Sequence, residues 1–305
     1  MKDRPLAWFA AILILFLFWS NSFHAIGWLR RTVSAWDLIT LRFAPVGLFC
    51  LIWAGLSRPS ENLRILRAHP LRLVLMGLLM VPIYNLCLNW GQGLVAAGTA
   101  ALLIATNPIL TYGIALLIRQ ERFQARKAIG LAVAFTGVFL LLRSQGRDLG
   151  ASYTTHALVT LLAPLSWAVA TLLGRPLVQR ESPVRVTYIS LGIGSLPFLF
   201  APLFQSSVRA EFLAFAVADH VAWIHLWLLC TIVGFAIWYA ALRHLPASSV
   251  AAFVLLNPPL AVAFGPIWGT DRLHATVLGF GAMILGGIAV SVWPGGALTP
   301  PKKGG

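Results

Sequence analysis

The chain has 305 residues, of which 59% are hydrophobic and only 10% are charged, and its mean hydropathy is +0.82. Because a soluble domain carries about a quarter charged residues, this composition excludes a water-soluble globular protein and predicts an integral membrane protein in contact with the lipid bilayer. The formal net charge is +14, but the basic residues lie at the ends of apolar blocks. They therefore indicate membrane orientation and not a nucleic-acid partner.

Ten apolar blocks follow one another along the chain, and a helix of this length can cross a hydrocarbon core of roughly 30 Å. We predict an all-α membrane protein with ten transmembrane helices at 6–28, 36–56, 71–90, 98–118, 127–142, 154–174, 186–204, 221–242, 247–268 and 275–293. The first block has no small-residue cleavage site and is expected to be a retained helix. The ninth block is broken by prolines, so a re-entrant segment is its alternative.

An even number of spans places both termini on one side of the membrane. If the N-terminus is cytoplasmic, 16 Lys and Arg residues fall in cytoplasmic segments and 6 on the opposite side. The positive-inside rule therefore favours a multi-pass protein of the cell membrane with both termini in the cytoplasm.

The chain also contains a weak internal repeat. A shift of 150 residues pairs Asn107-Pro108 with Asn257-Pro258, and a shift of 148 pairs Trp19 with Trp167. Each repeat holds five spans, so the second copy enters the membrane from the opposite side. We predict two inverted five-helix repeats, 1–146 and 147–296, followed by a cytoplasmic tail at 297–305. Inverted repeats are typical of secondary transporters, whose solute site lies between the halves.

Polar residues inside the first two spans are candidates for the site. Asn21 and His24 lie in the first span. His24 is compatible with proton coupling and also with a hydrogen bond between helices. Arg42 is the only formal charge well inside a span, so it predicts either a contact with solute or a structural anchor that reaches outward.

Polar and aromatic residues recur at helical spacing in the third span, where they favour a cavity-facing stripe: Tyr84, Asn85, Asn89 and Trp90. The eighth span offers Trp238 and Tyr239, and the sixth offers Trp167. An interfacial belt is the alternative for each tryptophan. A cavity with such walls suits amphipathic solutes such as amino acids.

The two Asn-Pro pairs predict helix kinks. Pro108 and Pro258 each lack an N–H and should free a carbonyl four residues earlier. In lipid that carbonyl needs a partner inside the protein or in a water-filled cavity. Asn107 and Asn257 are therefore candidates either for solute binding or for purely structural bonding, and the kinks could also act as hinges.

Motifs of catalysis and of cofactor binding are missing from the sequence. The cysteines have no metal-type spacing, and there is no phosphate-binding loop, His-Glu-x-x-His motif or nucleophile elbow. We expect no enzyme activity, no metal and no cofactor. The span cores contain no Asp or Glu, which leaves the energy source, proton coupling included, open.

Several stretches carry a family resemblance across about 6–293: FWSNSF, DLITLRFAP, AAGTAALLIATNPILTYGIALLIRQERF, GLAVAFTGVFLLL, LSWAVATLLGRPL, ASSVAAFVLLNPPLAV and GTDRLHATVLGFGAMILGGIAV. In their order and spacing they resemble the drug/metabolite transporter superfamily of the ten-helix EamA type. The resemblance implies a transporter of small metabolites, often amino acids and frequently in export. An arginine at the place of Arg42 is common in that family, and the second half lacks its counterpart.

These observations predict a secondary transporter that exports amino acids or related amphipathic solutes by alternating access around a central cavity between the repeats. A passive facilitator or channel, or a membrane subunit without transport activity, is the alternative. The sequence is compatible with a monomer.

Overall fold

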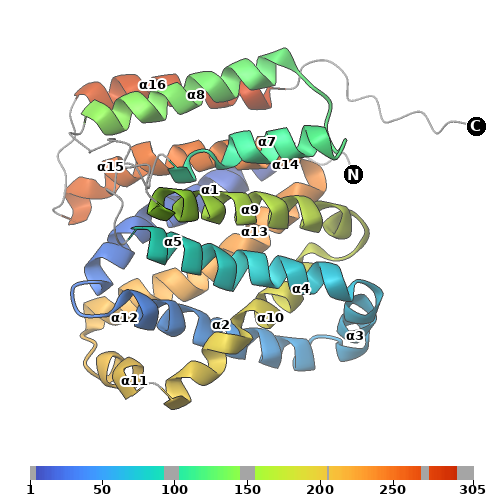
Figure 1. The fold of residues 1–305 in the computed structure, drawn as a ribbon, viewed down its shortest axis with the longest axis vertical. Helices are drawn as coiled ribbons and strands as arrows, with labels where there is room; N and C mark the ends of the chain where they lie inside the picture. Colours follow the sequence, from blue (N-terminus) through green and yellow to red (C-terminus); the bar gives the residue numbers. More distant parts are fainter. Residues whose placement is uncertain (1–4, 93–102, 145–154, 205, 269–274, 294–305) are drawn as a thin grey trace, which may run out of the picture.

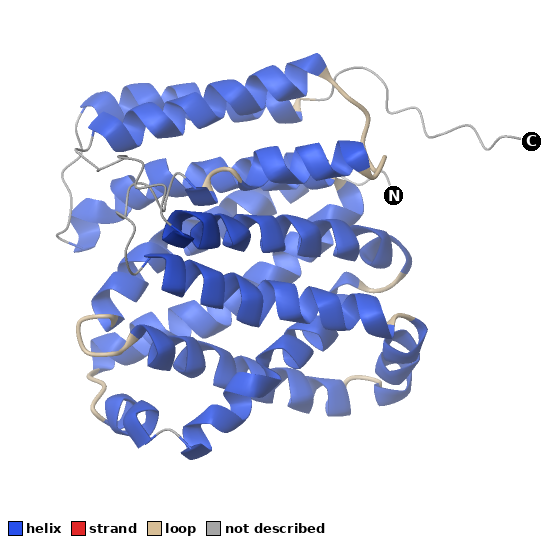
Figure 2. Cartoon of the chain, viewed as in Figure 1, coloured by secondary structure: helices blue, strands red, loops and turns tan. Residues whose placement is uncertain are grey.

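The computed structural model describes residues 5–92, 103–144, 155–204, 206–268 and 275–293, and in these residues it contains helices, turns and no strand (Figure 2). The first half consists of α1 (Pro5–Leu29), α2 (Ala35–Leu56), α3 (Pro59–Ala68), α4 (Pro70–Leu78), η1 (Leu79–Ile83), α5 (Tyr84–Gln92), α7 (Asn107–Leu117) and α8 (Ala125–Ser144). The second half consists of α9 (Thr155–Arg180), α10 (Pro183–Phe204), α11 (Ser206–Leu213), α12 (Val217–Ile224), η2 (His225–Val233), α13 (Gly234–His244), α14 (Ala247–Ala252), η3 (Phe253–Leu256), α15 (Asn257–Trp268) and α16 (Ala275–Val292).

Eight helical stretches among the described residues are long and apolar enough to cross a membrane: Ala7–Leu29, Ala35–Leu56, Pro70–Leu88, Ala125–Ser144, Leu158–Arg180, Pro183–Ala201, Val217–His244 and Ala247–Trp268. Two shorter apolar helices, Asn107–Leu117 and Leu278–Val292, fall in the expected fourth and tenth spans, and the beginning of the fourth lies outside the described residues. The ninth span is helical throughout and long enough to cross. The chain is therefore a multi-pass membrane protein.

Helix pairs from the two halves pack against each other in a regular pattern (Figure 1). α2 packs along α10 and α8 packs along α16, the latter pair forming one edge of the molecule in the figure. Likewise α1 lies against α15 while α9 lies against α7. A Cβ on Gly194 would lie 2.2 Å from the carbonyl oxygen of Gly77, so α4 and α10 meet closely only because both positions are glycine.

Two long helices contain π-helical turns at corresponding places. In η1 the N–H of Tyr84 bonds to the carbonyl of Leu79, and in η2 the N–H of Gly234 bonds to the carbonyl of Leu229. Both bonds span five residues, and the two sites are 150 positions apart. Single π turns inside α-helices are frequent at functional sites. Hydropathy predicted each of these spans but not the change of helix type within it.

Each Asn-Pro pair stands where regular α-helix begins after a local change of backbone geometry. α7 begins at Asn107 after a turn at 105–106, and α15 begins at Asn257 after the 3₁₀ helix η3. Proline is tolerated in a first helical turn, where its missing N–H would have no partner. The carbonyl of Val254, which Pro258 cannot bond, accepts a hydrogen bond from the N–H of Asn257. At Asn257-Pro258 the irregularity is thus a change of helix type, and the kinks at Pro108 and Pro258 stay a prediction.

The start of α1 and the end of α16 lie on the same side of the molecule (Figure 1). Trp8, near the start of α1, stacks on His244 at the end of α13, with ring centroids 4.5 Å apart. Arg126, near the start of α8, contacts the carbonyl of Trp293, just beyond α16. Because α14 begins directly after α13, these helix ends lie together, and we call this the terminal end. The opposite end, where α1 leads into α2, we call the mouth end.

Candidate functional site

A cavity of about 160 Å³ lies between the two halves. Its walls come from α1, α2, η1, α5, α9, η2, α13, η3, α15 and the segment before α7. An apolar cavity of about 150 Å³ can hold a benzene-sized molecule, so the space suits a small organic solute. Six residues that the sequence singled out line it: Arg42, Tyr84, Asn85, Asn107, Trp167 and Asn257.

Arg42 brings a guanidinium group into this cavity from α2. Its Nε donates a hydrogen bond to Oγ1 of Thr231 at 3.0 Å, and its Cζ lies 5.2 Å from the ring centroid of Phe43. Within the described residues Arg42 forms no ion pair. The bond to Thr231 uses one of the five N–H donors, so the fork-shaped Nη side is suited to a carboxylate.

Asn107 and Asn257 differ in how their amides are bonded. Nδ2 of Asn107 donates to the carbonyl of Pro164 at 2.9 Å, whereas its Oδ1 has no partner among the described residues and the residue is only 2% exposed. In contrast, Oδ1 of Asn257 accepts a hydrogen bond from the buried Ser20 hydroxyl at 3.1 Å. A buried acceptor without a partner is costly, so the amide of Asn107 is the less completely satisfied of the two.

Aromatic rings form one wall of the cavity. Trp167 makes edge contacts with Tyr84 at 5.6 Å and with Phe235 at 4.9 Å between ring centroids. Trp19 also lines the cavity, contacts Trp167 at 5.6 Å and donates from Nε1 to the carbonyl of Cys230 at 2.8 Å. Sequence reasoning omitted Trp19 and Phe235 from the site. The repeat pairing of Trp19 with Trp167 was the signal that could have included Trp19.

Two further candidates lie behind this wall and not on it. Trp238 is fully buried, and its Nε1 donates to Oγ1 of Thr171 at 3.2 Å. Tyr239 is fully buried beside Gly174, and its hydroxyl has no hydrogen-bond partner in the part of the chain that the structure describes. Both therefore belong to the packed interior, because the rotation of α13 turns Phe235 to the cavity instead.

Asn21 and His24 lie on another face of α1. Oδ1 of Asn21 accepts from Nε1 of Trp268 at 2.8 Å, and Nδ2 lies 3.5 Å from Nε2 of His225. Asn21 lines a second cavity of about 330 Å³ near the mouth end. His24 lies 2.7 Å from the carbonyl of Ala261 and its ring stacks on Trp268.

The side chains of Asn89 and Trp90 lie outside the described part of the chain. Asn85, one turn earlier, donates from Nδ2 to the carbonyl of Val81 at 2.8 Å. Among the described residues no three His, Cys, Asp or Glu side chains come together in a way that could hold a metal ion. The site thus offers charge and hydrogen bonds from Arg42 and the two asparagines, within aromatic walls.

Comparison with protein families matches two segments of the chain, 6–143 and 154–293, to the EamA-like transporter family. A relative from Streptantibioticus cattleyicolor, named "Probable terminal-alkyne amino-acid exporter", is 30% identical over 292 residues, which cover 94% of this chain and 93% of the relative. A relative from Salmonella typhimurium, named "Probable amino-acid metabolite efflux pump", is 24% identical over 65% of this chain and 68% of its own length.

A protein of known crystal structure has a similar fold. It superposes with a TM-score of 0.74 at 19% identity and covers 95% of this chain and 97% of its own. An "Uncharacterized transporter" from Archaeoglobus fulgidus is 26% identical over 88% of this chain and 93% of its own length. The similarity in sequence and in fold thus extends over nearly the whole chain.

Proposed function

Because the chain belongs to the EamA-like transporter family, we propose that it is a secondary transporter that exports a small carboxylate-bearing solute, an amino acid or a related amphipathic compound, through its central cavity. Family membership makes it a membrane transporter and not an enzyme. The names of two relatives, an exporter and an efflux pump, support the outward direction and the amino-acid class.

The observation that carries the proposed substrate class is the pair of unused polar groups in one cavity. Arg42 supplies a cation without an ion pair in the described residues, and Asn107 supplies an acceptor without a donor. An amino acid carries a carboxylate for the first and an ammonium group for the second. The aromatic wall around Trp167 suits its apolar side chain.

The proposed architecture is ten spans in two inverted five-helix repeats, 1–146 and 147–296. Two separate family matches support it. So do the reciprocal packing of α1 on α15 and α9 on α7, and the π turns 150 residues apart. Such repeats allow two related states, one open to each side, which is the basis of alternating access. With both termini cytoplasmic, the mouth end faces outward.

A proteoliposome assay tests the proposal. Uptake of labelled amino acids is measured with and without an imposed proton gradient, and each solute is compared with its carboxamide, which has the same shape without the negative charge. We expect the carboxylate form to be transported at least about tenfold better, because a charged hydrogen bond contributes roughly 1.5–3 kcal/mol. Equal transport of both forms would refute the carboxylate assignment. Accumulation above equilibrium identifies coupled transport, whereas strict equilibration identifies a facilitator.

A further inference from the structure

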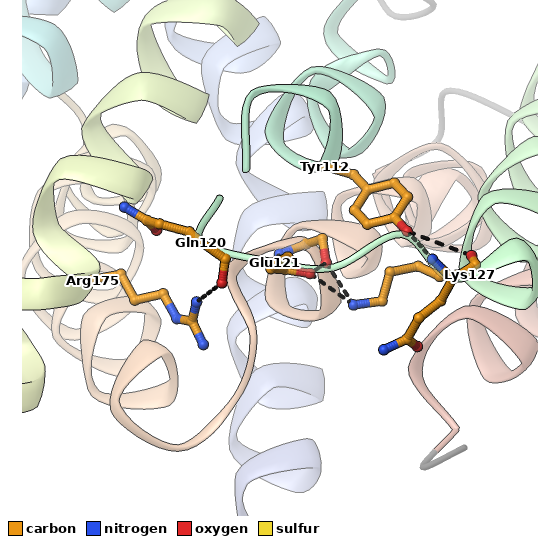
Figure 3. A network of polar contacts seen from close by, with 7 residues as sticks. Tyr112, Gln120, Glu121, Lys127 and Arg175 are labelled. Carbon is orange, nitrogen blue, oxygen red and sulfur yellow. Dashed lines mark hydrogen bonds and ion pairs between the residues drawn. The ribbon is translucent and has the colours of Figure 1, made fainter. Parts of the chain in front are cut away.

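A second group of charged side chains lies at the terminal end and includes no residue that lines the cavity. Figure 3 shows Glu121 and Lys127 pointing toward each other within this group. Glu121, in the loop between α7 and α8, has Oε2 2.9 Å from Nζ of Lys127. Ser248 at the start of α14 donates its N–H to Oε1 of Glu121 at 3.0 Å and its hydroxyl to Oε2 at 2.5 Å, and it accepts a bond from Lys127 at 2.8 Å. The side chains of Glu121 and Lys127 are each 7% exposed. We call these three residues the Glu121 cluster.

The same loop is also bonded to α9. Gln120 donates from Nε2 to the carbonyl of Leu172 at 3.1 Å, and Arg175 donates from Nη1 to the carbonyl of Gln120 at 3.4 Å (Figure 3). On its other side the loop is held by Tyr112, whose hydroxyl accepts the N–H of Gln124 at 2.7 Å. One loop of the first half thus joins two helices of the second half, α9 and α14, by partly buried hydrogen bonds.

The same helices reach both the cavity and the neighbourhood of the Glu121 cluster. On α9, Trp167 lines the cavity at mid-helix and Arg175, which bonds to the loop, lies eight residues further on, about 12 Å along a helix. In the continuous helical stretch of α14, η3 and α15, Asn257 lines the cavity at the middle and Ser248 lies in the first turn. α7 likewise starts at the cavity with Asn107 and ends at the loop.

Between the two sites the interior is filled by aromatic rings. Phe16 contacts Trp238 and Phe253 with centroids 6.4 and 6.3 Å apart. Phe16 precedes the cavity residue Trp19 on α1, and Trp238 follows the cavity residue Phe235 on α13. Phe16 and Trp238 are fully buried and Phe253 is 6% exposed. No cavity wall of the described residues reaches past this layer toward the terminal end.

At the mouth end the arrangement is the reverse. Ile26, in the last turn of α1, and Ala35, the first residue of α2, both line the cavity. Phe23 also lines it and is 42% exposed. The cavity therefore extends to the mouth end and is closed toward the terminal end.

We propose that the Glu121 cluster is the latch of the gate at the terminal end, which holds α14 and α9 against the α7–α8 loop while the cavity faces the mouth end and releases them when the cavity opens to the other side. The inference rests on the proposed alternating access. Glu121 and Lys127 both belong to the first half, so the contacts that cross the gate are the hydrogen bonds of Ser248 with these two charged side chains. Hydrogen bonds to charged groups are stronger than neutral ones, and water can replace them only once it enters between the halves.

An exposed ion pair at the same end provides the matched control. Arg64 on α3 binds Glu181, which directly follows α9, through two hydrogen bonds of 3.0 and 2.7 Å. The side chain of Arg64 is 56% exposed and that of Glu181 is 13% exposed, so water reaches and screens this pair from the Arg64 side. Replacing Glu181 with Gln removes the same charge as replacing Glu121 with Gln, but it breaks no buried contact.

The test measures access of water-soluble reagents to the terminal end and requires no solute. Cys50, Cys87 and Cys230 are first replaced with Ala, and the buried Ser249 carries a reporter thiol as Ser249→Cys. The rate of labelling by a membrane-impermeant maleimide is then compared for this parent and for Glu121→Gln, Ser248→Ala and Glu181→Gln in detergent micelles. Ser248→Ala keeps the ion pair and removes one hydroxyl, so it keeps the test decisive if Glu121→Gln does not fold.

We expect Glu121→Gln to speed labelling of the reporter about tenfold or more, as for the loss of one charged contact. Ser248→Ala should speed labelling less, and Glu181→Gln should leave the labelling rate unchanged. A second reporter, Ala35→Cys at the mouth end, should be labelled more slowly in Glu121→Gln because the two ends open alternately. Unchanged labelling at both reporters in a folded Glu121→Gln or Ser248→Ala protein would overturn the latch. Faster labelling at the terminal end in a protein that transports no solute would instead refute the proposed function and retain the gate.

Discussion

Nε of Arg42 on α2 donates a hydrogen bond to Oγ1 of Thr231, 3.0 Å away in the π-helical segment η2. Thr231 in turn donates its hydroxyl hydrogen to the carbonyl of Leu226, five residues earlier, at 2.9 Å. The π turn therefore places a hydroxyl from the second half where it orients the one guanidinium of the cavity. This connection links the proposed carboxylate-binding group to a helix whose geometry is already irregular.

The first prediction concerns this orientation. Thr231→Val should raise the KM for a carboxylate solute several-fold and lower the stability by about 1 kcal/mol, because both hydrogen bonds of the hydroxyl are lost. Thr231→Ser keeps the hydroxyl and should behave like the unaltered protein. Transport kinetics in proteoliposomes and thermal unfolding in detergent provide the two measurements. A normal KM in Thr231→Val would mean that Arg42 is positioned without Thr231.

The second prediction separates the two asparagines of the repeat. Asn107→Ala removes the acceptor that has no protein partner, so it should raise the KM for an amino acid about tenfold, as expected for a lost charged hydrogen bond. Asn257→Ala leaves the buried Ser20 hydroxyl without its acceptor and should act mainly on stability, by about 1–3 kcal/mol. Equal KM changes in the two variants would contradict this assignment.

A third prediction tests the close approach of α4 and α10. A methyl group at position 194 would lie 2.2 Å from the Gly77 carbonyl oxygen, so Gly194→Ala should force the helices apart and destabilise the protein by about 1–3 kcal/mol or more. Gly113→Ala is the control, because a Cβ at that position would meet nothing within 4 Å. The thermal unfolding midpoint of Gly194→Ala should be clearly lower than that of Gly113→Ala. Similar midpoints would mean that α10 can shift without loss of stability.

The fourth prediction follows from the position of Tyr239. Its hydroxyl is buried without a hydrogen-bond partner, so Tyr239→Phe removes a desolvated polar group and keeps the ring that packs beside Gly174. We expect an equal or higher unfolding midpoint and unchanged solute transport. A marked loss of transport would instead indicate that Tyr239 contacts the solute, as the sequence predicted.

The sequence allowed much of the fold to be predicted, for a physical reason. Lipid requires long apolar helices, so hydropathy located the eight spans that the described residues contain. Polar atoms are rare at membrane depth and tend to face the interior, which is why Arg42, Asn107 and Asn257 were singled out and why all three line one cavity.

What could not be predicted depends on contacts between distant segments. Ser20 on α1 donates to the side-chain oxygen of Asn257, whereas Pro164 on α9 accepts from the side-chain nitrogen of Asn107 and leaves its oxygen unbonded within the described residues. Both partners lie on other helices. Trp238 and Phe235 lie three residues apart on α13. The orientation of the helix about its axis places Phe235 at the cavity and Trp238 in the packed interior. The π turns leave no hydropathy signal, because they alter backbone bonding without altering composition.

The last prediction is a pH dependence of stability that originates in Glu121. Burial alone would raise the pKa of this carboxyl, but the charge of Lys127 and the hydrogen bonds from Ser248 outweigh it and hold the pKa below its ordinary value of 4.5. A carboxyl whose pKa is lower in the folded state stabilises the fold above its unfolded pKa and loses that contribution as the pH falls through the folded pKa.

The unfolding midpoint of the unaltered protein should therefore fall more steeply below about pH 4.5 than that of Glu121→Gln, while the difference between the two stays constant at neutral pH. Glu181→Gln should retain more of the steep fall than Glu121→Gln does: the hydrogen bond from Arg64 also lowers the pKa of Glu181, but the Arg64 side chain is 56% exposed and water screens the pair. Parallel pH profiles for the unaltered protein and Glu121→Gln would show that the buried pair contributes nothing to folding, and the Glu121 cluster would then lack the strength that a latch requires.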